Sequence, residues 1–238
     1  MASLLDRRYL IPAFILTGIW YIVCIRFVPE PWCAPFKVIP LALLIAAIIR
    51  AQRGTSGDRA AWVLPVVALC LSAVGDTFGD LKVGSFKDMA FLLQIFFFMA
   101  AHFVYIASFM RFAGRPRPDG LSKGDTAGRL VCTAAVVAFL LIYSNVIIPK
   151  VESVTFRYAV GAYMIVISVM CLSAIMQSRE RVWPIIAGAL VFMASDAIIA
   201  WTSFVPDHGI PAAVDDLAVM GTYYAAQLLI NIGLVKRS

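Results

Sequence analysis

Residues 183–204 read WPIIAGALVFMASDAIIAWTSF and decide how the chain folds. This stretch is apolar almost throughout and long enough to cross a bilayer as one helix. Ser195 and Asp196 nevertheless lie within it, and a carboxylate in mid-membrane costs about 2.5–3.5 kcal/mol on insertion scales. A second apolar stretch, residues 61–78, carries Asp76 at nearly the same depth. Because intramembrane acids usually face the protein interior and have a function, these two acids are the first candidates for a site.

The composition assigns the whole chain to a membrane. Hydrophobic residues make up 62% of the sequence and charged residues 14%, whereas a water-soluble domain has about a quarter charged residues. No segment is both polar and long enough for a separate soluble domain, so we expect one integral membrane domain over residues 1–238. The net charge of +6 comes from basic residues in the connections between apolar runs. This distribution fits orientation in a membrane and argues against nucleic acid as a partner.

The apolar runs predict an all-α polytopic membrane protein. A bilayer-spanning helix needs about 20 mostly apolar residues, and the sequence holds eight segments of this kind. The predicted transmembrane helices cover about 9–28, 34–50, 61–79, 89–112, 130–148, 157–177, 182–204 and 214–235.

Basic residues fall unevenly on the two sides of these segments, fourteen on one side and four on the other. Because cytoplasmic loops are enriched in Lys and Arg, both termini are predicted to be cytoplasmic. The basic side holds Arg7, Arg8, Arg50, Arg53, Arg59, Arg111, Arg115, Arg117, Lys123, Arg129, Arg179, Arg181, Lys236 and Arg237, and the other holds Lys82, Lys87, Lys150 and Arg157.

Several familiar signatures do not occur. The five cysteines lack paired-ligand spacing and four lie within apolar runs, so we predict neither a disulfide framework nor a zinc site. The first apolar run is followed by Pro29-Glu30-Pro31 and not by a small-residue cleavage site, which favours a helix over a signal peptide. There is no Gly-x-Ser-x-Gly elbow, His-Glu-x-x-His pair or phosphate loop, so serine hydrolases and nucleotide-driven proteins have no support.

Polar side chains from five segments are predicted to gather in one layer of the membrane. With cytoplasmic termini, the third and seventh segments run outward, and Asp76 and Asp196 lie about 15 residues in, or roughly 22 Å at the helical rise. The second, fourth and eighth segments run inward, so polar residues near their starts reach the same outer layer. This convergence indicates a cavity. The additional residues are Lys37, Gln94, Tyr223 and Tyr224, with His102 and Gln227 somewhat deeper.

The two acids could work as a pair. Two carboxyl groups close together in a low-dielectric site cannot both ionise, so one keeps its proton at neutral pH. A pair of Asp76 and Asp196 would then supply a general acid and an anionic partner. The structural alternative is a buried acid bonded to a neighbouring helix, with Lys37 as its ion-pair partner. Asp80 shares a face with Asp76 if the helix continues past Gly79, and is otherwise a solvated loop residue.

The other polar residues each have a functional and a structural interpretation. Lys37 could bind a phosphate group as a point charge or extend to the membrane surface. His102 and Tyr105 lie three residues apart; a lone intramembrane His is more often a satisfied hydrogen-bond donor, although one His and two Asp could hold a metal. Tyr223 and Gln227 share a helix face, and a mid-helix Gln needs a partner in lipid.

The two acids are half a chain apart, in segments of the same direction. A parallel four-plus-four repeat would bring Asp76 and Asp196 together across a pseudo-twofold axis, although little other self-similarity is present. The connection 111–129 joins the two halves and is rich in Pro, Gly and basic residues. Its charge could contact anionic head groups, but membrane orientation alone accounts for it.

An ordered set of residues carries a family resemblance: Lys37 with Pro40, Gly75-Asp76, His102 with Tyr105, Ser195-Asp196, and Tyr224 with Gln227. In this order and spacing, over nearly the whole chain, they resemble the YhhN/TMEM86 family of eight-helix membrane proteins, whose characterised members are lysoplasmalogenases. The chain differs from the family pattern where Val38 and Ile39 separate Lys37 from Pro40. It differs again at Gly79, where the family tends to have Leu.

The resemblance implies hydrolysis of the vinyl ether bond of a lysoplasmalogen, yielding a fatty aldehyde and a glycerophospho-head group, with no cofactor. A vinyl ether is protonated at carbon, and water then attacks the oxocarbenium ion. A carboxyl acid beside a carboxylate suits this reaction, so we predict Asp76 and Asp196 to be catalytic. The expected partners are a lysophospholipid with a vinyl ether tail and membrane lipids. The predicted substrate-binding residues are Lys37, Asp80, Gln94, His102, Tyr105, Ser195, Tyr223, Tyr224 and Gln227.

Two other functions fit the same residues. A proton-coupled transporter or lipid carrier would use the acids as protonation sites, although the segments lack the mid-span Gly/Pro breaks common in transporters. A metal-dependent lipid hydrolase would combine His102 with the acids. The membrane is expected to be the plasma membrane in a bacterium or the endoplasmic reticulum in a eukaryote.

Overall fold

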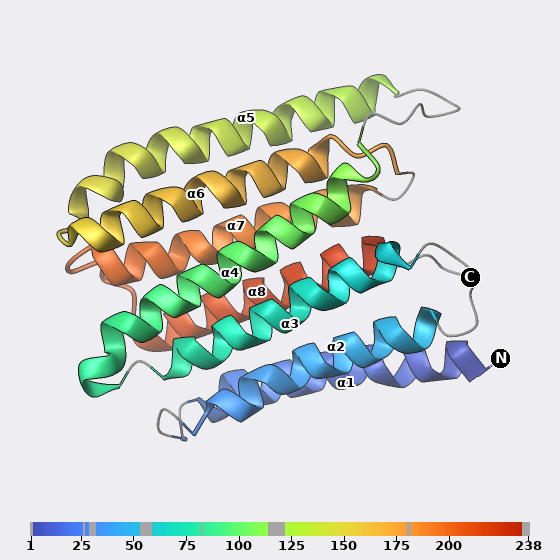
Figure 1. Cartoon of the computed structure of the whole chain (residues 1–238), viewed down its shortest axis with the longest axis horizontal. Coiled ribbons are helices and arrows are strands. Elements are labelled where there is room, and N and C mark those ends of the chain that lie inside the picture. Colours follow the sequence, from blue (N-terminus) through green and yellow to red (C-terminus); the bar gives the residue numbers. More distant parts are fainter. Residues whose placement is uncertain are drawn as a thin grey trace.

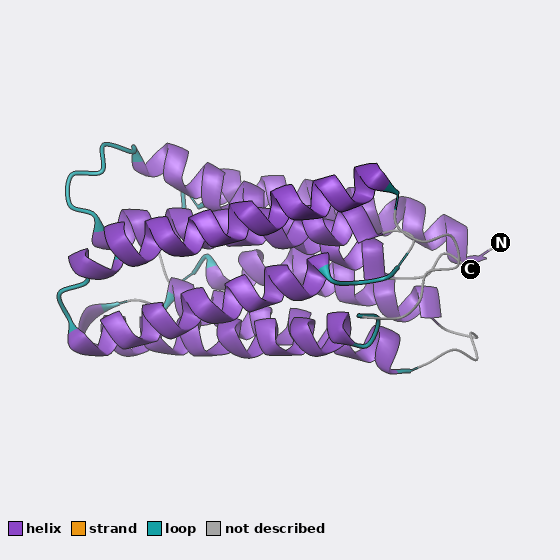
Figure 2. Ribbon diagram, turned by 90° about the horizontal axis from the view of Figure 1, so that it is seen from above, coloured by secondary structure: helices purple, strands orange, loops and turns teal. Residues whose placement is uncertain are grey.

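The computed structural model describes residues 2–25, 27–28, 32–52, 59–81, 83–113, 122–179 and 182–234, with the side chains of residues 2–8 left out. Within these ranges the chain is helical, with no strand (Figures 1 and 2). Each of the eight predicted segments coincides with one helix, which confirms the all-α prediction. The helices are α1 Ala2–Cys24, α2 Ala34–Gln52, α3 Ala60–Asp80, α4 Lys87–Met110, α5 Lys123–Val146, α6 Val154–Ile175, α7 Val182–Phe204 and α8 Ala212–Leu234, with short 3-10 turns η1 Gly84–Phe86 and η2 Ile148–Lys150.

Several helix ends differ from the prediction, three of them by four residues or more, because hydropathy marks the apolar part of a helix and not its ends. Helix α1 begins at Ala2, where 9 was predicted. Helix α5 begins at Lys123, where 130 was predicted. Ser122 caps it, since its hydroxyl accepts a hydrogen bond of 3.0 Å from the backbone N–H of Asp125. Helix α1 ends at Cys24, where 28 was predicted, and the N–H of Val28 then donates to the Cys24 carbonyl at 2.9 Å to close a turn.

The helices form an elongated bundle with two central and two flanking hairpins. Figure 1 shows α3–α4 and α7–α8 in the middle, with α1–α2 on one flank and α5–α6 on the other. Helix α3 packs on α4 and α2, α7 packs on α8, and α4 also packs on α6. The start of α1 and the end of α8 lie at the same end of the bundle (Figure 1, right).

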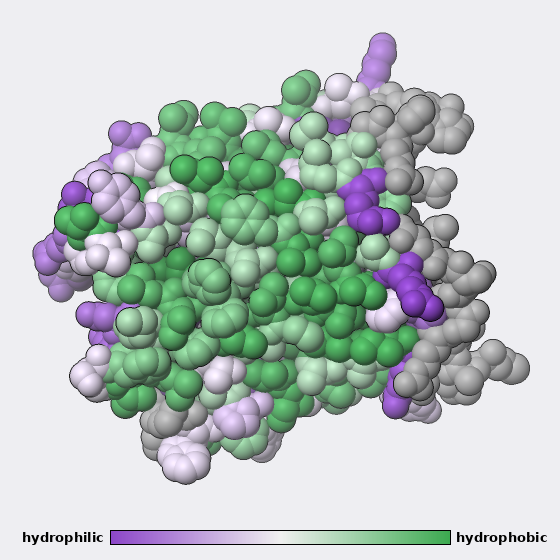
Figure 3. Space-filling view, viewed as in Figure 1, coloured by the Kyte–Doolittle hydropathy of each residue, from purple (hydrophilic) through white to green (hydrophobic). Residues whose placement is uncertain are grey.

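The bundle has the surface of an integral membrane protein. Seven helices, α2 to α8, are long and apolar enough to cross a membrane, and Tyr9–Cys24 of α1 forms a shorter apolar helix. Figure 3 shows a broad hydrophobic band across the middle of the molecule, with hydrophilic residues toward its ends.

Part of the charge pattern and of the connections lies outside the described residues. Within them, Arg179 marks the end shared by the start of α1 and the end of α8, since its guanidinium donates to the Leu234 carbonyl at 2.9 Å and so caps α8. Outside them lie Pro29-Glu30-Pro31, residues 114–121 of the 111–129 connection, Arg53, Lys82, Arg115, Arg117, Arg181, Lys236 and Arg237, together with the side chains of Arg7 and Arg8.

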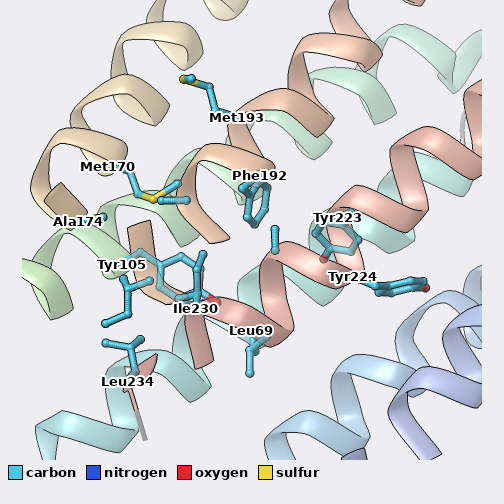
Figure 4. Close-up of a cluster of buried hydrophobic side chains, with 14 of the residues drawn as sticks. Leu69, Tyr105, Met170, Ala174, Phe192, Met193, Tyr223, Tyr224, Ile230 and Leu234 are labelled. Carbon is cyan, nitrogen blue, oxygen red and sulfur yellow. The ribbon is translucent and has the colours of Figure 1, made fainter. Parts of the chain in front are cut away.

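The central hairpin α7–α8 is packed closely around small residues. A Cβ atom added at Gly188 would lie 2.8 Å from the Ile230 nitrogen and 3.0 Å from the Ala226 oxygen, so only glycine permits this approach of the two backbones. Large side chains fill the adjacent core, and Figure 4 shows Phe192 of α7 facing Tyr223 of α8 within it. This hairpin fixes the relative positions of the polar residues on α7 and α8.

Candidate functional site

Three charged side chains meet where α2 begins and α3 ends. The Nζ atom of Lys37 lies 2.9 Å from Oδ1 of Asp80 and 3.8 Å from Oδ1 of Asp76. The two acids are one helical turn apart, so both face α2. All three are buried, with 7% of Lys37, 2% of Asp76 and 3% of Asp80 exposed. Lys37 therefore does not extend to the surface, and Asp80 is a buried residue of the last helical turn. We call these three residues the Lys37 cluster.

Tyrosines from α1 and α8 surround the Lys37 cluster. Tyr223 donates a hydrogen bond to Oδ2 of Asp76 at 2.7 Å, and Tyr21 donates to Oδ2 of Asp80 at 3.4 Å. Tyr224 donates to the backbone carbonyl of Lys37 at 2.9 Å. Four helices thus contribute to one buried cluster. Because removing one partner of a buried ion pair costs about 3–5 kcal/mol, loss of Lys37 alone should destabilise this end of the bundle.

The second acid, Asp196 of α7, has separate partners from α4 and α6. The hydroxyl of Tyr163 donates to Oδ2 of Asp196 at 2.6 Å and lies 2.8 Å from Nε2 of His102. Nε2 of His102 also lies 3.6 Å from Oδ2 of Asp196, so the three groups are in mutual contact. The His102 side chain is fully buried, and 14% of the Asp196 side chain is exposed. We call these three residues the Asp196 cluster.

The hydrogen-bond directions in the Asp196 cluster follow from the donors available. When Asp196 is ionised, Tyr163 gives it the single hydroxyl proton, so the Tyr163 oxygen accepts from His102. The imidazole proton is then on Nε2, and Nδ1 is a bare nitrogen. Nδ1 is buried without a hydrogen-bond partner.

The two acids are therefore not hydrogen-bonded to each other. The sequence predicted a side-by-side pair, whereas the structure has two separate clusters with an aromatic ring between them. Phe192 packs against both, with ring centroids 4.8 Å from His102 and 5.5 Å from Tyr223, which is bonded to Asp76. A sequence gives the depth of a residue but not the direction in which its side chain points, and here the two side chains point to different neighbours.

An apolar cavity lies beside Asp196, between α4, α6 and α7. Its volume is about 50 Å³, several times the roughly 10–15 Å³ that one water requires on the same measure. Three of its lining residues are polar, Gln94, Tyr163 and Asp196, and the others are aliphatic or aromatic. The ring of Phe91 lies 5.9 Å from that of Phe204, and both line the cavity. The cavity thus combines space for an apolar group with a carboxyl group in its wall.

Gln94 links this cavity to the Lys37 cluster. A Cβ atom on Gly79 would lie 2.8 Å from Nε2 of Gln94 and 3.3 Å from Nζ of Lys37, so the missing side chain at this position leaves room for both groups. Gln94 is 8% exposed, and its Oε1 atom has no hydrogen-bond partner. Gln94 is thus a buried amide with one end unpaired.

Other predicted residues form a third network, which lies away from the cavity. Tyr105 donates to Oε1 of Gln227 at 2.7 Å, and Nε2 of Gln227 donates to the Ser72 hydroxyl at 3.2 Å. Asn231 donates to the Tyr105 oxygen at 3.3 Å. These bonds join α3, α4 and α8, and they satisfy polar groups that would otherwise be unpaired in the membrane.

Ser195 also takes part in helix packing. Its hydroxyl donates to the Val219 carbonyl at 2.9 Å and joins α7 to α8. Of the residues predicted from sequence, the structure therefore brings Lys37, Asp76, Asp80, Tyr223 and Tyr224 together. It places Gln94 and Asp196 in the wall of the cavity, and His102 is buried beside Asp196.

Two functional candidates were missed by the sequence analysis. Tyr163 is the central member of the Asp196 cluster, and Tyr21 is bonded to Asp80. Both stand alone in apolar runs, where Tyr is ordinarily read as packing. Depth was the available signal for Tyr163, because it lies nine residues from the start of α6 while Asp196 lies eight residues from the end of α7, near the same end of the bundle.

A metal site has little support in the donor set. Among the described residues, no group of three or more His, Cys, Asp and Glu side chains is arranged to hold a metal ion. In the Asp196 cluster the Nε2 atom of His102 is occupied by Tyr163, and only one carboxylate is near it.

The fold and these clusters define a class: a polytopic α-helical membrane protein with titratable side chains buried around an apolar cavity inside the membrane. The model of the YhhN family matches residues 32–234, and the chain belongs to this family. It is 28% identical to lysoplasmalogenase TMEM86B of Rattus norvegicus, over 97% of this chain and 85% of the rat protein. It is 26% identical to lysoplasmalogenase TMEM86A of Bos taurus, over 95% and 88% respectively. No solved structure matches the chain.

Proposed function

We propose that this protein is a membrane lipid hydrolase that cleaves the vinyl ether bond of a lysoplasmalogen. The observation that carries the proposal is the Asp196 carboxyl group in the wall of an apolar cavity within the membrane. A lipid tail can enter such a cavity from the bilayer, and the acid is then beside the first bonds of the tail. The names of the TMEM86A and TMEM86B relatives support the same reaction.

The chemistry requires one proton and one water. A carboxyl group protonates the β-carbon of the vinyl ether, and the double-bond electrons form the new C–H bond. This leaves an oxocarbenium ion, to whose carbon water adds. The resulting hemiacetal breaks its C–O bond, so that the fatty aldehyde leaves and the glycerol oxygen gains a proton. The proton given in the first step is recovered from the attacking water, so no cofactor is consumed.

We assign the proton transfer to Asp196 because it is the acid that lines the cavity. Tyr163 and His102 hold its carboxyl group in place, because the Tyr163 hydroxyl is bonded to both the carboxyl group and Nε2 of His102. Asp76 acts at longer range, since its negative charge stabilises the oxocarbenium ion across the ring of Phe192. Charges buried in a low-dielectric interior act on one another more strongly than charges in water.

The same proposal includes an orientation. We place both termini in the cytoplasm, from the excess of basic residues on that side. The Lys37 cluster and the cavity then lie in the outer half of the membrane, and the polar head group of the substrate lies at the outer surface near α2. The parallel four-plus-four repeat also remains a prediction, supported by the matching positions of the α3–α4 and α7–α8 hairpins in the centre of the bundle (Figure 1).

The test is aldehyde release from a lysoplasmalogen by protein purified in detergent. We expect Asp196→Asn to lower kcat by at least about 100-fold, in the range of general acid catalysis, and Asp76→Asn to lower it by about 10-fold. Asp88→Asn, an exposed acid in the first turn of α4, is the matched control and should retain full activity. Full activity of Asp196→Asn would remove that acid from the mechanism, and lipid uptake into proteoliposomes without aldehyde release would favour a carrier.

A further inference from the structure

The amide of Gln94 has one polar atom that lacks a hydrogen-bond partner in the described part of the protein. It lines the apolar cavity that also contains Asp196 and Tyr163. Its Oε1 atom is fully buried and has no hydrogen-bond partner among the described residues. A buried polar atom left unpaired costs about 1–3 kcal/mol. The last torsion of a Gln side chain is soft, so the amide of this cavity-lining residue can turn to bond a ligand in the cavity.

The position of Gln94 also limits what that partner can be. The room left by Gly79 holds one end of the amide near Nζ of Lys37, while the other end stays without a partner. The two ends of an amide are assigned from their hydrogen bonds, and exchanging them would place an unpaired NH₂ where the unpaired oxygen is now. A hydroxyl group both donates and accepts, and therefore pairs with either end.

We propose that Gln94 binds the free sn-2 hydroxyl of the lysolipid and thereby selects lysolipids over their diacyl counterparts. This inference rests on the proposed function, because the substrate of that reaction carries such a hydroxyl on the carbon next to the one that bears the ether oxygen. Anchoring the hydroxyl at Gln94 fixes the vinyl ether only a few bonds away. Asp196 and Tyr163, in the wall of the same cavity, then face the bond that is cleaved.

Selectivity follows from what an acylated lipid lacks. An ester at the sn-2 position has no proton to donate, so Oε1 of Gln94 remains unpaired in the complex. A site built to hydrogen-bond a hydroxyl discriminates strongly against an analogue without it, because its own polar group loses its partner.

The experiment compares two vinyl ether lipids that differ in one atom, the lysoplasmalogen and its 2-deoxy analogue. We measure kcat/KM for aldehyde release from each by the wild type, Gln94→Met and Gln177→Met. Methionine matches glutamine in length and removes the amide. Gln177 is the matched control because it is also fully buried with both amide atoms unpaired, but lies at the opposite end of the bundle, beyond the end of α6.

We expect the wild type and Gln177→Met to prefer the hydroxylated lipid by about 5- to 100-fold, the range set by one unpaired buried group. In Gln94→Met this preference should fall to within about twofold of the intrinsic acid lability of the two lipids. Each ratio is taken within one protein, so partial misfolding of a variant cancels. Equal preference in Gln94→Met and the wild type would overturn the proposal. So would an equal loss on both lipids, which would instead make Gln94 a residue that positions the attacking water.

A binding measurement separates this inference from the proposed function. Saturated ether lysolipids, with and without the sn-2 hydroxyl, are not hydrolysed, and each raises the unfolding temperature according to its affinity. If the wild type releases no aldehyde but is stabilised more by the hydroxylated lipid, and Gln94→Met is not, the hydroxyl site stands and the hydrolase proposal fails. Equal stabilisation of the wild type by both lipids would refute the hydroxyl site, whatever the enzyme assay gives.

Discussion

Replacing Tyr163 by Phe removes one oxygen atom from the centre of the Asp196 cluster and leaves the ring in place. That oxygen is 2.6 Å from Oδ2 of Asp196 and 2.8 Å from Nε2 of His102. A hydrogen bond to a charged group is worth about 1.5–3 kcal/mol, and a buried donor left without a partner costs about 1–3 kcal/mol. The second cost is partly recovered, because Nε2 of His102 is already 3.6 Å from Asp196 and can move to bond it directly. The net loss of stability should be about 2–4 kcal/mol.

For a chain of this size, that loss corresponds to a fall in Tm of roughly 5–15 °C. The same substitution should lower kcat by about 10- to 100-fold with KM changed less than about threefold, because it releases the acid but leaves the apolar wall intact. Thermal unfolding in detergent and aldehyde release measure the two effects on one preparation. Tyr158→Phe is the matched control, since Tyr158 is on the same helix and 76% exposed. If Tyr163→Phe retained kcat within twofold of the wild type, Tyr163 would not position Asp196.

Three further substitutions test the packing around the site. Lys37→Met should destabilise the protein by about 3–5 kcal/mol because it leaves two buried carboxylates without their cation. Adding Asp80→Asn should recover part of this loss, which thermal unfolding of the single and double variants measures. Gly75→Ala should cost about 1–3 kcal/mol, since the new Cβ would lie 2.9 Å from the Phe98 ring, whereas Gly221→Ala meets nothing within 4 Å and should leave the Tm unchanged. Gly79→Ala should lower activity more than stability, because its Cβ displaces the flexible ends of Gln94 and Lys37; a loss of Tm with intact kcat would contradict this.

The fold was predictable because a bilayer imposes a simple rule on sequence. Each spanning helix must satisfy its own backbone and cover it with apolar side chains, so each appears as one long apolar run. The ends of the helices were harder to predict. Ser122 extends α5 to Lys123 through a cap that hydropathy does not register.

The sequence predicted which residues gather at one depth better than it predicted which of them contact each other. Depth along each helix follows from residue counting, and this brought Lys37, Asp76 and Asp196 into one layer. The direction of each side chain depends on how the helices rotate against one another, and no pattern in one sequence fixes that rotation. Asp196 therefore faces Tyr163 of α6 and not the other acid. Depth along α6 could have placed Tyr163 in the same layer, but its contacts with Asp196 and His102 depend on the rotation of that helix.

The separation of the two acids has a chemical consequence that a contacting pair would lack. The Lys37 cluster holds two carboxyl groups for one ammonium, so it carries surplus negative charge when both are ionised. The ring of Phe192 lies between that charge and the Asp196 cluster, so in the proposed mechanism Asp196 exchanges a proton with the substrate without first competing for Lys37. In the proposed reaction, an oxocarbenium ion formed beside Asp196 would be attracted to both carboxylates through the low-dielectric interior of the bundle. The cation is thus stabilised as it forms, while Lys37 limits the repulsion that two buried acids would otherwise impose on the folded protein.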